Sequence, residues 1–204
     1  SLCRGDLYET TAAALRGGAS IVQLREKDRP SGELLEIARK LRELTLEHDA
    51  VFLINDDVTV ASLSGADGVH LGQQDLEPRE ARKILGPAAI IGLSTHCRDQ
   101  AAAAAPLGAD YIGVGPIHET QTKEHREAVG PEYIRVAREA TPLPGYAIGR
   151  VDHTTSDRVM AAGADRVAVC TGIIAQEDPE AATRYLVERI EAGCDSAPPG
   201  AKPA

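Results

Sequence analysis

Tryptophan is absent from this chain of 204 residues, which has one phenylalanine, one methionine and five tyrosines. A core built on large aromatic side chains is therefore excluded. Ala, Val, Ile and Leu are plentiful instead, and 43% of the residues are hydrophobic, which suits helices that pack closely on a parallel sheet. The length fits one domain or two small ones, and we predict one.

The chain also lacks an excess of positive charge, since its net charge is -9. This argues against nucleic acid and anionic membranes as partners, although a local group of basic residues can still bind an anionic substrate. No apolar run has the length of a membrane span, and no segment resembles a signal peptide. The four cysteines show no metal-ligand spacing, so we predict a cytoplasmic protein with reduced thiols. They are Cys3, Cys97, Cys170 and Cys194.

Seven short apolar runs predict buried parallel strands, and amphipathic helical segments separate them. The runs are Ser20 to Leu24, Val51 to Ile54, Gly68 to Leu71, Ala89 to Gly92, Asp110 to Val114, Gly145 to Ile148 and Arg166 to Val169. The clearest helices are Asp6 to Arg16, Gly32 to His48, Arg98 to Leu107 and Glu180 to Ala192.

A short repeat supports this alternation. Gly-Ala-Ser occurs at 18 to 20, and Gly-Ala-Asp occurs at 65 to 67, 108 to 110 and 163 to 165. Each glycine follows a predicted helix, where a left-handed residue is wanted, and each triplet leads into a strand. The copies lie roughly two βα units apart, which favours an α/β fold of the (β/α)8 TIM-barrel type. An open doubly wound sheet is the alternative.

Only seven strands are found for this barrel, because the chain enters a helix at about Asp6. The expectation is therefore a barrel that lacks its first β-strand, either as a fragment or with an unusual N-terminus. Residues 1 to 193 are predicted as a single TIM-barrel domain. The stretch 194 to 204 is rich in Pro, Gly and Ala and is predicted as a disordered tail.

Polar side chains follow the first strands. Gln23, Arg25 and Lys27 suit a multiply charged phosphate group, with a solvated charged loop as the alternative. Asp56 and Asp75 follow two neighbouring strands, so both carboxylates are expected at the same edge, where they suit Mg²⁺. The alternative is that Asp56 or Asp57 caps a helix and that Asp75 lies in a turn.

Three residues of the next strands have ordinary structural interpretations. By residue type alone, Ser94 favours a helix cap over a substrate contact. His70 is predicted as a hydrogen-bonded interior histidine, and His96 as incidental.

The longest predicted βα loop contains Thr120, Thr122 and Lys123, which suit a phosphate or oxyanion clamp. Barrels often bind phosphate after their last two strands, and Gly149 and the amides near Thr171 are the candidates there.

Together these motifs resemble the thiamine-phosphate synthase family over about Asp6 to Glu191. The matching stretches are VQLREKD at 22 to 28, LINDDV at 53 to 58, GADGVHLGQQDL at 65 to 76, IGLSTH at 91 to 96, GADYIGVGPI and TQTK between 108 and 123, and AIG at 147 to 149. The resemblance implies a transferase of thiamine biosynthesis. It would join a pyrimidine diphosphate to a thiazole phosphate and release pyrophosphate.

The resemblance also implies roles for individual residues. Arg25, Lys27, Ser94 and Lys123 would act in catalysis at the pyrimidine diphosphate, with Asp56 and Asp75 holding Mg²⁺ on its pyrophosphate. The remaining substrate-binding residues would be Gln23, Asn55, Thr120, Thr122, Gly149, Cys170 and Thr171.

Three features depart from the family pattern. Arg150 stands where a second glycine is usual, TQTK lacks the usual proline between its threonines, and the first strand is missing. The oligomeric state stays open, with a homo-oligomer as one option, and so does the form of the thiazole that is accepted. The alternatives for function are a thiazole tautomerase and a non-catalytic barrel that binds thiazole or thiamine phosphate.

Overall fold

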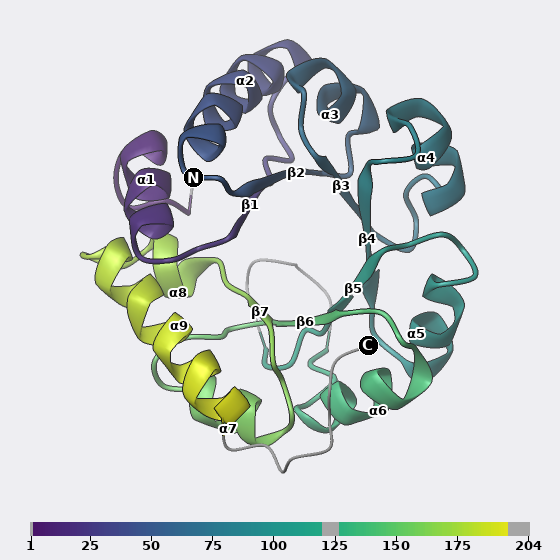
Figure 1. Ribbon diagram of the computed structural model, residues 1–204, viewed down its shortest axis with the longest axis vertical. Helices are drawn as coiled ribbons and strands as arrows, with labels where there is room; N and C mark the ends of the chain where they lie inside the picture. Colours follow the sequence, from purple (N-terminus) through teal and green to yellow (C-terminus); the bar gives the residue numbers. More distant parts are fainter. Residues whose placement is uncertain (1, 120–126, 196–204) are drawn as a thin grey trace.

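The computed structural model describes residues 2–119 and 127–195 (Figure 1). Its strands form one parallel sheet in which each strand pairs with the next along the chain. The strands are β1 (Ile21–Leu24), β2 (Val51–Asn55), β3 (Gly68–Leu71), β4 (Ile90–Thr95), β5 (Tyr111–Val114), β6 (Gly145–Ile148) and β7 (Val167–Ala168). All seven predicted strands are confirmed, with ends that shift by a few residues.

The strand order decides between the two predicted architectures. A doubly wound sheet reverses its strand order near the middle, whereas here the order is β1 to β7 without interruption. Figure 1 shows the sheet curled, with the helices outside the curl. The TIM-barrel prediction is confirmed. The described residues before the first helix contain no strand, which agrees with the predicted lack of a first strand.

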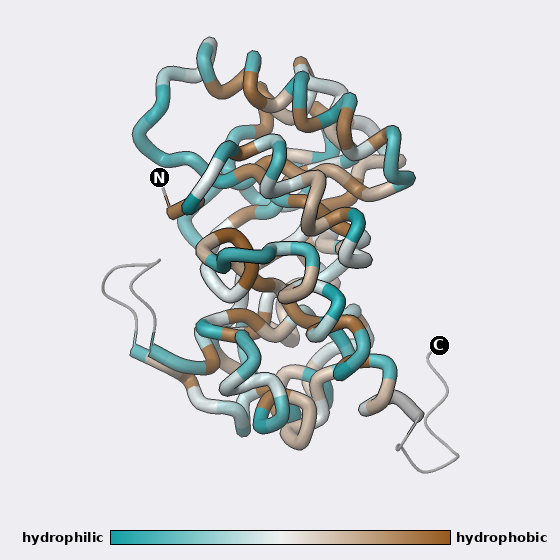
Figure 2. Tube along the Cα trace, turned by 90° about the vertical axis from the view of Figure 1, so that its left-hand side faces the viewer, coloured by the Kyte–Doolittle hydropathy of each residue, from teal (hydrophilic) through white to brown (hydrophobic). Residues whose placement is uncertain are grey.

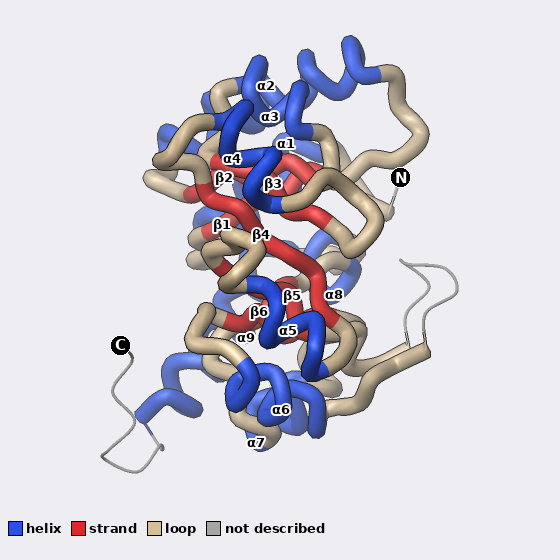
Figure 3. The backbone as a smooth tube through the Cα atoms, turned by 90° about the vertical axis from the view of Figure 1, so that its right-hand side faces the viewer, coloured by secondary structure: helices blue, strands red, loops and turns tan. Residues whose placement is uncertain are grey.

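The helices are α1 (Leu7–Arg16), α2 (Ser31–Glu47), α3 (Val58–Ser64), α4 (Pro78–Leu85), α5 (Arg98–Ala104), α6 (Glu132–Ala140), α7 (Ser156–Ala161), α8 (Thr171–Ile174) and α9 (Pro179–Asp195). Helices and strands alternate from α1 to α8, and α9 follows α8 directly; Figure 3 shows the helices in blue and the strands in red. Helix α1 packs on α8 and α9, as Figure 1 shows. Helix α9 runs into the segment predicted as a tail, and residues 196–204 lie outside the described part. None of the helices described here is both long and apolar enough to cross a bilayer.

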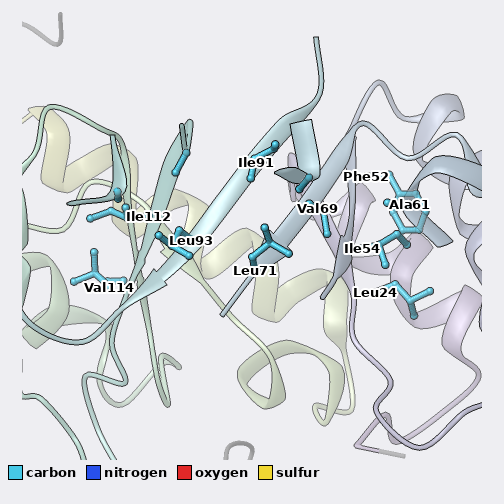
Figure 4. Packing of buried hydrophobic residues seen from close by; sticks show 14 of the residues in the cluster. Leu24, Phe52, Ile54, Ala61, Val69, Leu71, Ile91, Leu93, Ile112 and Val114 are labelled. Atoms are coloured by element: carbon cyan, nitrogen blue, oxygen red, sulfur yellow. The ribbon is translucent and has the colours of Figure 1, made fainter. Parts of the chain in front are cut away.

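The main core lies between the outer face of the sheet and the helices. Alternate strand residues, such as Ile54, Val69 and Ile91, are fully buried there against small helical residues such as Ala61 (Figure 4). Along the helices, short hydrophobic stretches alternate with hydrophilic ones (Figure 2). Each large side chain buried in this way contributes about 1.5–3 kcal/mol. The other strand residues, among them Gln23, Asn55 and Ser94, face the inside of the curl.

The Gly-Ala repeat ends four helices in the same way. Gly18, Gly65, Gly108 and Gly163 all have positive φ, between 69° and 103°. The alanine after each glycine donates its N–H to the carbonyl five residues earlier, which is the Schellman bond. Asp49 takes the glycine's place after α2, with φ 52°, and Ala50 makes the same bond to Thr45 at 2.9 Å. The predicted left-handed glycines are confirmed.

Two aspartates of the repeat, Asp67 and Asp110, hold the amino-terminal edge of the sheet. Asp67 accepts two hydrogen bonds of 2.8 Å from the Arg42 guanidinium and one of 2.7 Å from the N–H of Phe52 in β2. Asp110 accepts one hydrogen bond from Arg82 and one from the N–H of Ile91 in β4, both at 2.7 Å. A bidentate arginine pair that also satisfies a strand N–H fixes a helix to two strands.

Candidate active site

The candidate site begins where β1 and β2 end. Gln23 lies in β1 on the face opposite the buried Leu24, and its Nε2 donates to Oδ1 of Asn55 at the end of β2, at 3.4 Å. The parallel pairing of the two strands brings these side chains to the same edge. Two of the predicted substrate-binding residues are therefore neighbours.

Arg25 directly follows β1, and its guanidinium lies toward the segment after β7, the last strand of the sheet. Its guanidinium is close enough to Cys170, which follows β7, to act on that thiol's pKa. Burial raises the Cys170 pKa and Arg25 opposes the rise, with a raised pKa as the result. The buried Arg25 Nε has no hydrogen-bond partner among the described residues. Such a donor is suited to an anionic ligand. Lys27 is exposed nearby.

The two neighbouring aspartates after β2 have different tasks. Asp57 caps α3, because its Oδ1 accepts from the N–H of Val60 at 2.9 Å. Asp56 is held with φ 63°, and its N–H donates to the carbonyl of His70 in β3 at 2.9 Å. A left-handed aspartate is uncommon and costs conformational energy. The cap alternative therefore applies to Asp57, and Asp56 stays a metal-ligand candidate.

Asp75 lies in the turn after β3. Its Oδ2 accepts from the N–H of Gly72 at 2.7 Å, so the turn interpretation is confirmed, and it leaves a carboxylate at the exposed end of the strand. Asp56 and Asp75 thus follow adjacent strands. Within residues 2–119 and 127–195 no three His, Cys, Asp or Glu side chains gather as a metal site. Two carboxylates fit Mg²⁺, which commonly takes its other ligands from water and substrate phosphate.

Ser94 is a strand residue on the inner face. It lies in β4, and α5 begins only at Arg98, so the interpretation of Ser94 as a helix cap is wrong. Pairing with β5 extends β4 to Thr95 and places Ser94 opposite Gly113. The Ser94 Oγ is 2.8 Å from Nε2 of His70.

His70 is satisfied in the interior, as predicted. Its Nδ1 is 2.9 Å from the hydroxyl of Tyr111, whose ring packs edge-on against that of Tyr146. A Cβ at Gly92 would lie 2.1 Å from the Tyr111 ring and 2.5 Å from the His70 Nδ1, so the lack of a side chain there makes room for both. His70 therefore belongs to the structure that holds Ser94.

Gln73 and Tyr111 also support this part of the site, although no motif in the sequence indicates them. Gln73 Nε2 donates to the carbonyl of Ser94 at 2.7 Å, and Tyr111 contacts the ring that binds the Ser94 hydroxyl. A glycine inside a strand often marks a close approach of neighbouring groups, so Gly92 between His70 and Tyr111 was the available signal.

The ends of β6 and β7 form a second part of the site. Gly149 has φ 113°, and its carbonyl accepts from the N–H of His118 at 3.3 Å. A Cβ at Gly149 would lie 2.6 Å from the nitrogen of Ile117, so only glycine fits against this loop. Cys170 and Thr171 stand at the start of the short helix α8. The predicted residues Thr120, Thr122 and Lys123 lie outside the described residues.

A depression of about 580 Å³ lies at the opposite edge of the sheet. Its lining includes Val51 and Ile90, the first residues of β2 and β4, together with Arg42 and Asp67. Barrel enzymes place their chemistry at the carboxyl ends of the strands, and here the paired polar side chains lie at those ends. We therefore assign the site to that edge.

Comparison with known proteins shows the family to which the chain is similar. A family model described as thiamine monophosphate synthase matches residues 1–173. Thiamine-phosphate synthase of Gloeobacter violaceus is 48% identical over 188 residues, which are 92% of this chain and 55% of that protein. The Thermus thermophilus thiamine-phosphate synthase is 44% identical, over 89% of this chain and 88% of that protein.

A solved structure is similar throughout. Thiamine phosphate pyrophosphorylase from Pyrococcus furiosus has a TM-score of 0.85 and 36% identity, and covers 92% of this chain and 91% of that chain. The chain spans about half the length of several curated relatives that it matches.

Proposed function

This chain belongs to the thiamine monophosphate synthase family, and from that premise we propose that it is a thiamine-phosphate synthase. Its substrates would be 4-amino-2-methyl-5-(diphosphooxymethyl)pyrimidine and 4-methyl-5-(2-phosphooxyethyl)thiazole. Its products would be thiamine phosphate and pyrophosphate. A cytoplasmic location and a homo-oligomer stay predictions.

The observation that carries the proposal is the gathering, along one sheet edge, of side chains whose chemistry suits an anion and a metal ion. Gln23 contacts Asn55, and the left-handed Asp56 lies beside His70. Arg25 presents a buried Nε that has no hydrogen-bond partner in the described part of the chain. A guanidinium, side-chain amides and carboxylates at one edge suit the binding of a diphosphate together with its metal ion.

The reaction needs no nucleophile from the protein. The bond between the pyrimidine methylene carbon and the diphosphate oxygen breaks, and its electron pair leaves with pyrophosphate. The electron-rich aminopyrimidine stabilises the methylene cation, and the lone pair of the thiazole nitrogen then forms the new carbon–nitrogen bond. The barrier is lowered by groups that stabilise the charge growing on pyrophosphate, here Arg25, Lys27 and Lys123.

Asp56 and Asp75 would hold Mg²⁺, which when bound neutralises the negative charge of the leaving pyrophosphate. The protein's own part is to fix the two carboxylates. Asp57 takes the helix cap, and Asp56 next to it is held in the left-handed conformation. Ser94, held by His70, would bind the pyrimidine between the strand ends.

The test is pyrophosphate release from the two substrates, each alone and together, with and without Mg²⁺. We expect release that needs both substrates and Mg²⁺, and that falls by about 10²-fold or more in Arg25→Gln. Glu36→Gln, on the exposed side of α2, is the control and should keep full activity. Tight binding of thiazole phosphate without turnover would favour a binding protein instead, and proton exchange on the thiazole without release would favour a tautomerase.

A further inference from the structure

Arg150 follows β6 and Gly149 in a strained backbone conformation. Its φ is 50°, in the left-handed region that favours glycine. Most side chains pay a conformational cost there, and such strain collects at functional positions. The strain is a reason to ask what the arginine side chain does at this position.

The backbone around Arg150 lies between the two loops that end β5 and β7. On one side, Gly149 accepts a hydrogen bond from His118. On the other, a Cβ at Gly172 would lie 2.3 Å from the carbonyl oxygen of Val151, so the start of α8 packs closely on this segment. Arg150 therefore stands next to both proposed phosphate-binding elements, the Gly149 backbone and the turn at Thr171.

The Arg150 charge is not neutralised by the part of the protein that the structure describes. Its side chain is exposed, and no ion pair or side-chain hydrogen bond is formed within residues 2–119 and 127–195. The carboxylate nearest in sequence, Asp152, accepts instead from the N–H and hydroxyl of Thr154 and from the hydroxyl of Thr155. Thr155 also donates to the Arg150 carbonyl at 2.7 Å, which fixes the backbone but leaves the guanidinium available.

We propose that Arg150 is a specificity-determining residue, and that its guanidinium binds the phosphate ester of the thiazole substrate beside Gly149 and Thr171. This inference rests on the proposed function and adds a cation to a site otherwise made of backbone amides and hydroxyls. A guanidinium presents a planar pair of donors to two phosphate oxygens. Selection for the phosphorylated form would account for an arginine at a position whose backbone favours glycine.

The test compares binding of three ligands by calorimetry: the thiazole phosphate, the same thiazole as its free alcohol, and the pyrimidine diphosphate. Arg150→Asn removes the charge and keeps a residue that tolerates the left-handed conformation. We expect Kd for the thiazole phosphate to rise about tenfold, with the alcohol and the pyrimidine diphosphate changed by less than about twofold. The dependence of thiazole phosphate binding on salt should also weaken.

Arg150→Gly is the second variant, and it should melt at or above the wild-type temperature while showing the same loss. Arg158→Gln, which removes an exposed arginine from α7, is the matched control and should bind all three ligands as the wild type does. Wild-type affinity for the thiazole phosphate in both Arg150 variants, or an equal loss of affinity for the alcohol, would overturn this inference and leave the proposed function unaffected. Failure of the wild type to bind thiazole phosphate would overturn the proposed function as well.

Discussion

His70 and Ser94 are joined by a hydrogen bond of 2.8 Å between Nε2 and Oγ, across neighbouring strands on the inner face of the sheet. The other ring nitrogen lies 2.9 Å from the Tyr111 hydroxyl. Burial raises the pKa of that hydroxyl, which keeps it neutral and able to donate. When Tyr111 donates to Nδ1, Nε2–H donates to the Ser94 Oγ, so the Tyr111 hydroxyl fixes the His70 tautomer that holds Ser94.

Removing the Tyr111 hydroxyl tests this relay. Tyr111→Phe leaves the Nδ1 of the half-buried His70 without this partner, so we expect a loss of about 1–2 kcal/mol in the free energy of unfolding. Turnover should fall with it, because the orientation of Ser94 is no longer fixed. Urea unfolding and steady-state kinetics measure the two effects. Tyr146→Phe is the control, because the Tyr146 hydroxyl makes no hydrogen bond within the described residues, and equal effects from both variants would contradict the relay.

The repeated aspartates allow a matched comparison of stability. Asp67 has a bidentate partner in Arg42, and their side chains are 29% and 19% exposed. Asp165, at the same place in the repeat, pairs with the adjacent Arg166 at 2.9 Å and is 42% exposed. We expect Asp67→Asn to cost about 2–3 kcal/mol in unfolding free energy, and Asp165→Asn less than about 0.5 kcal/mol. Similar midpoints for the two variants in urea would show that the Arg42 contact contributes little.

The left-handed residue after α2 leads to a substitution that we expect to stabilise the fold. Asp49 has φ 52° where the repeat has glycine, so Asp49→Gly should stabilise the fold by about 0.5 kcal/mol, after the greater freedom of glycine in the unfolded chain is subtracted. Gly65→Ala is the reverse experiment. A Cβ there meets no atom within 4 Å, so its expected loss of about 1 kcal/mol is purely conformational. Thermal unfolding measures both, and a stabilised Gly65→Ala would contradict the argument.

The turn after β6 predicts a dependence on pH. Burial raises the pKa of Asp152, but hydrogen bonds from Thr154 and Thr155 outweigh it and hold the pKa below its usual range. The ionised carboxylate is therefore favoured in the folded state. Its stabilisation is complete above the unfolded pKa, near about 4, and is lost as the pH falls through the lower folded pKa.

We expect the unfolding free energy of the wild type to exceed that of Asp152→Asn at about pH 6, and the difference to shrink by about pH 3. Urea unfolding at the two pH values measures this. A difference that stays constant would mean that the carboxylate does not titrate differently in the two states.

Most of the fold could be predicted from local patterns in the sequence. The apolar runs predicted all seven strands because strands of a parallel sheet that is covered on both faces are nearly continuous hydrophobic runs. The left-handed conformation of Gly65 followed from its place after a helix. The choice of a barrel rested on the spacing of the Gly-Ala repeat, and the uninterrupted strand order confirms it.

The site was less predictable where its contacts join distant segments. A serine beside a helix start usually caps it, and only the pairing of Ser94 with Gly113 shows that it belongs to a strand. The partners of His70 could not be read from sequence either, because Tyr111 lies two βα units away. Which of Asp56 and Asp57 caps α3 depended on backbone angles that both residues tolerate.

The uninterrupted strand order also bears on how the chain folds. Every strand finds its partner one helix away, so the sheet can grow by short-range steps from more than one starting point. The packing of α1 on α9 is different, because it brings opposite ends of the described chain together. We therefore expect this contact to form late in folding, after the segments between the two helices have collapsed. The cooperativity of the last folding step would then depend on the packing of α1 on α9.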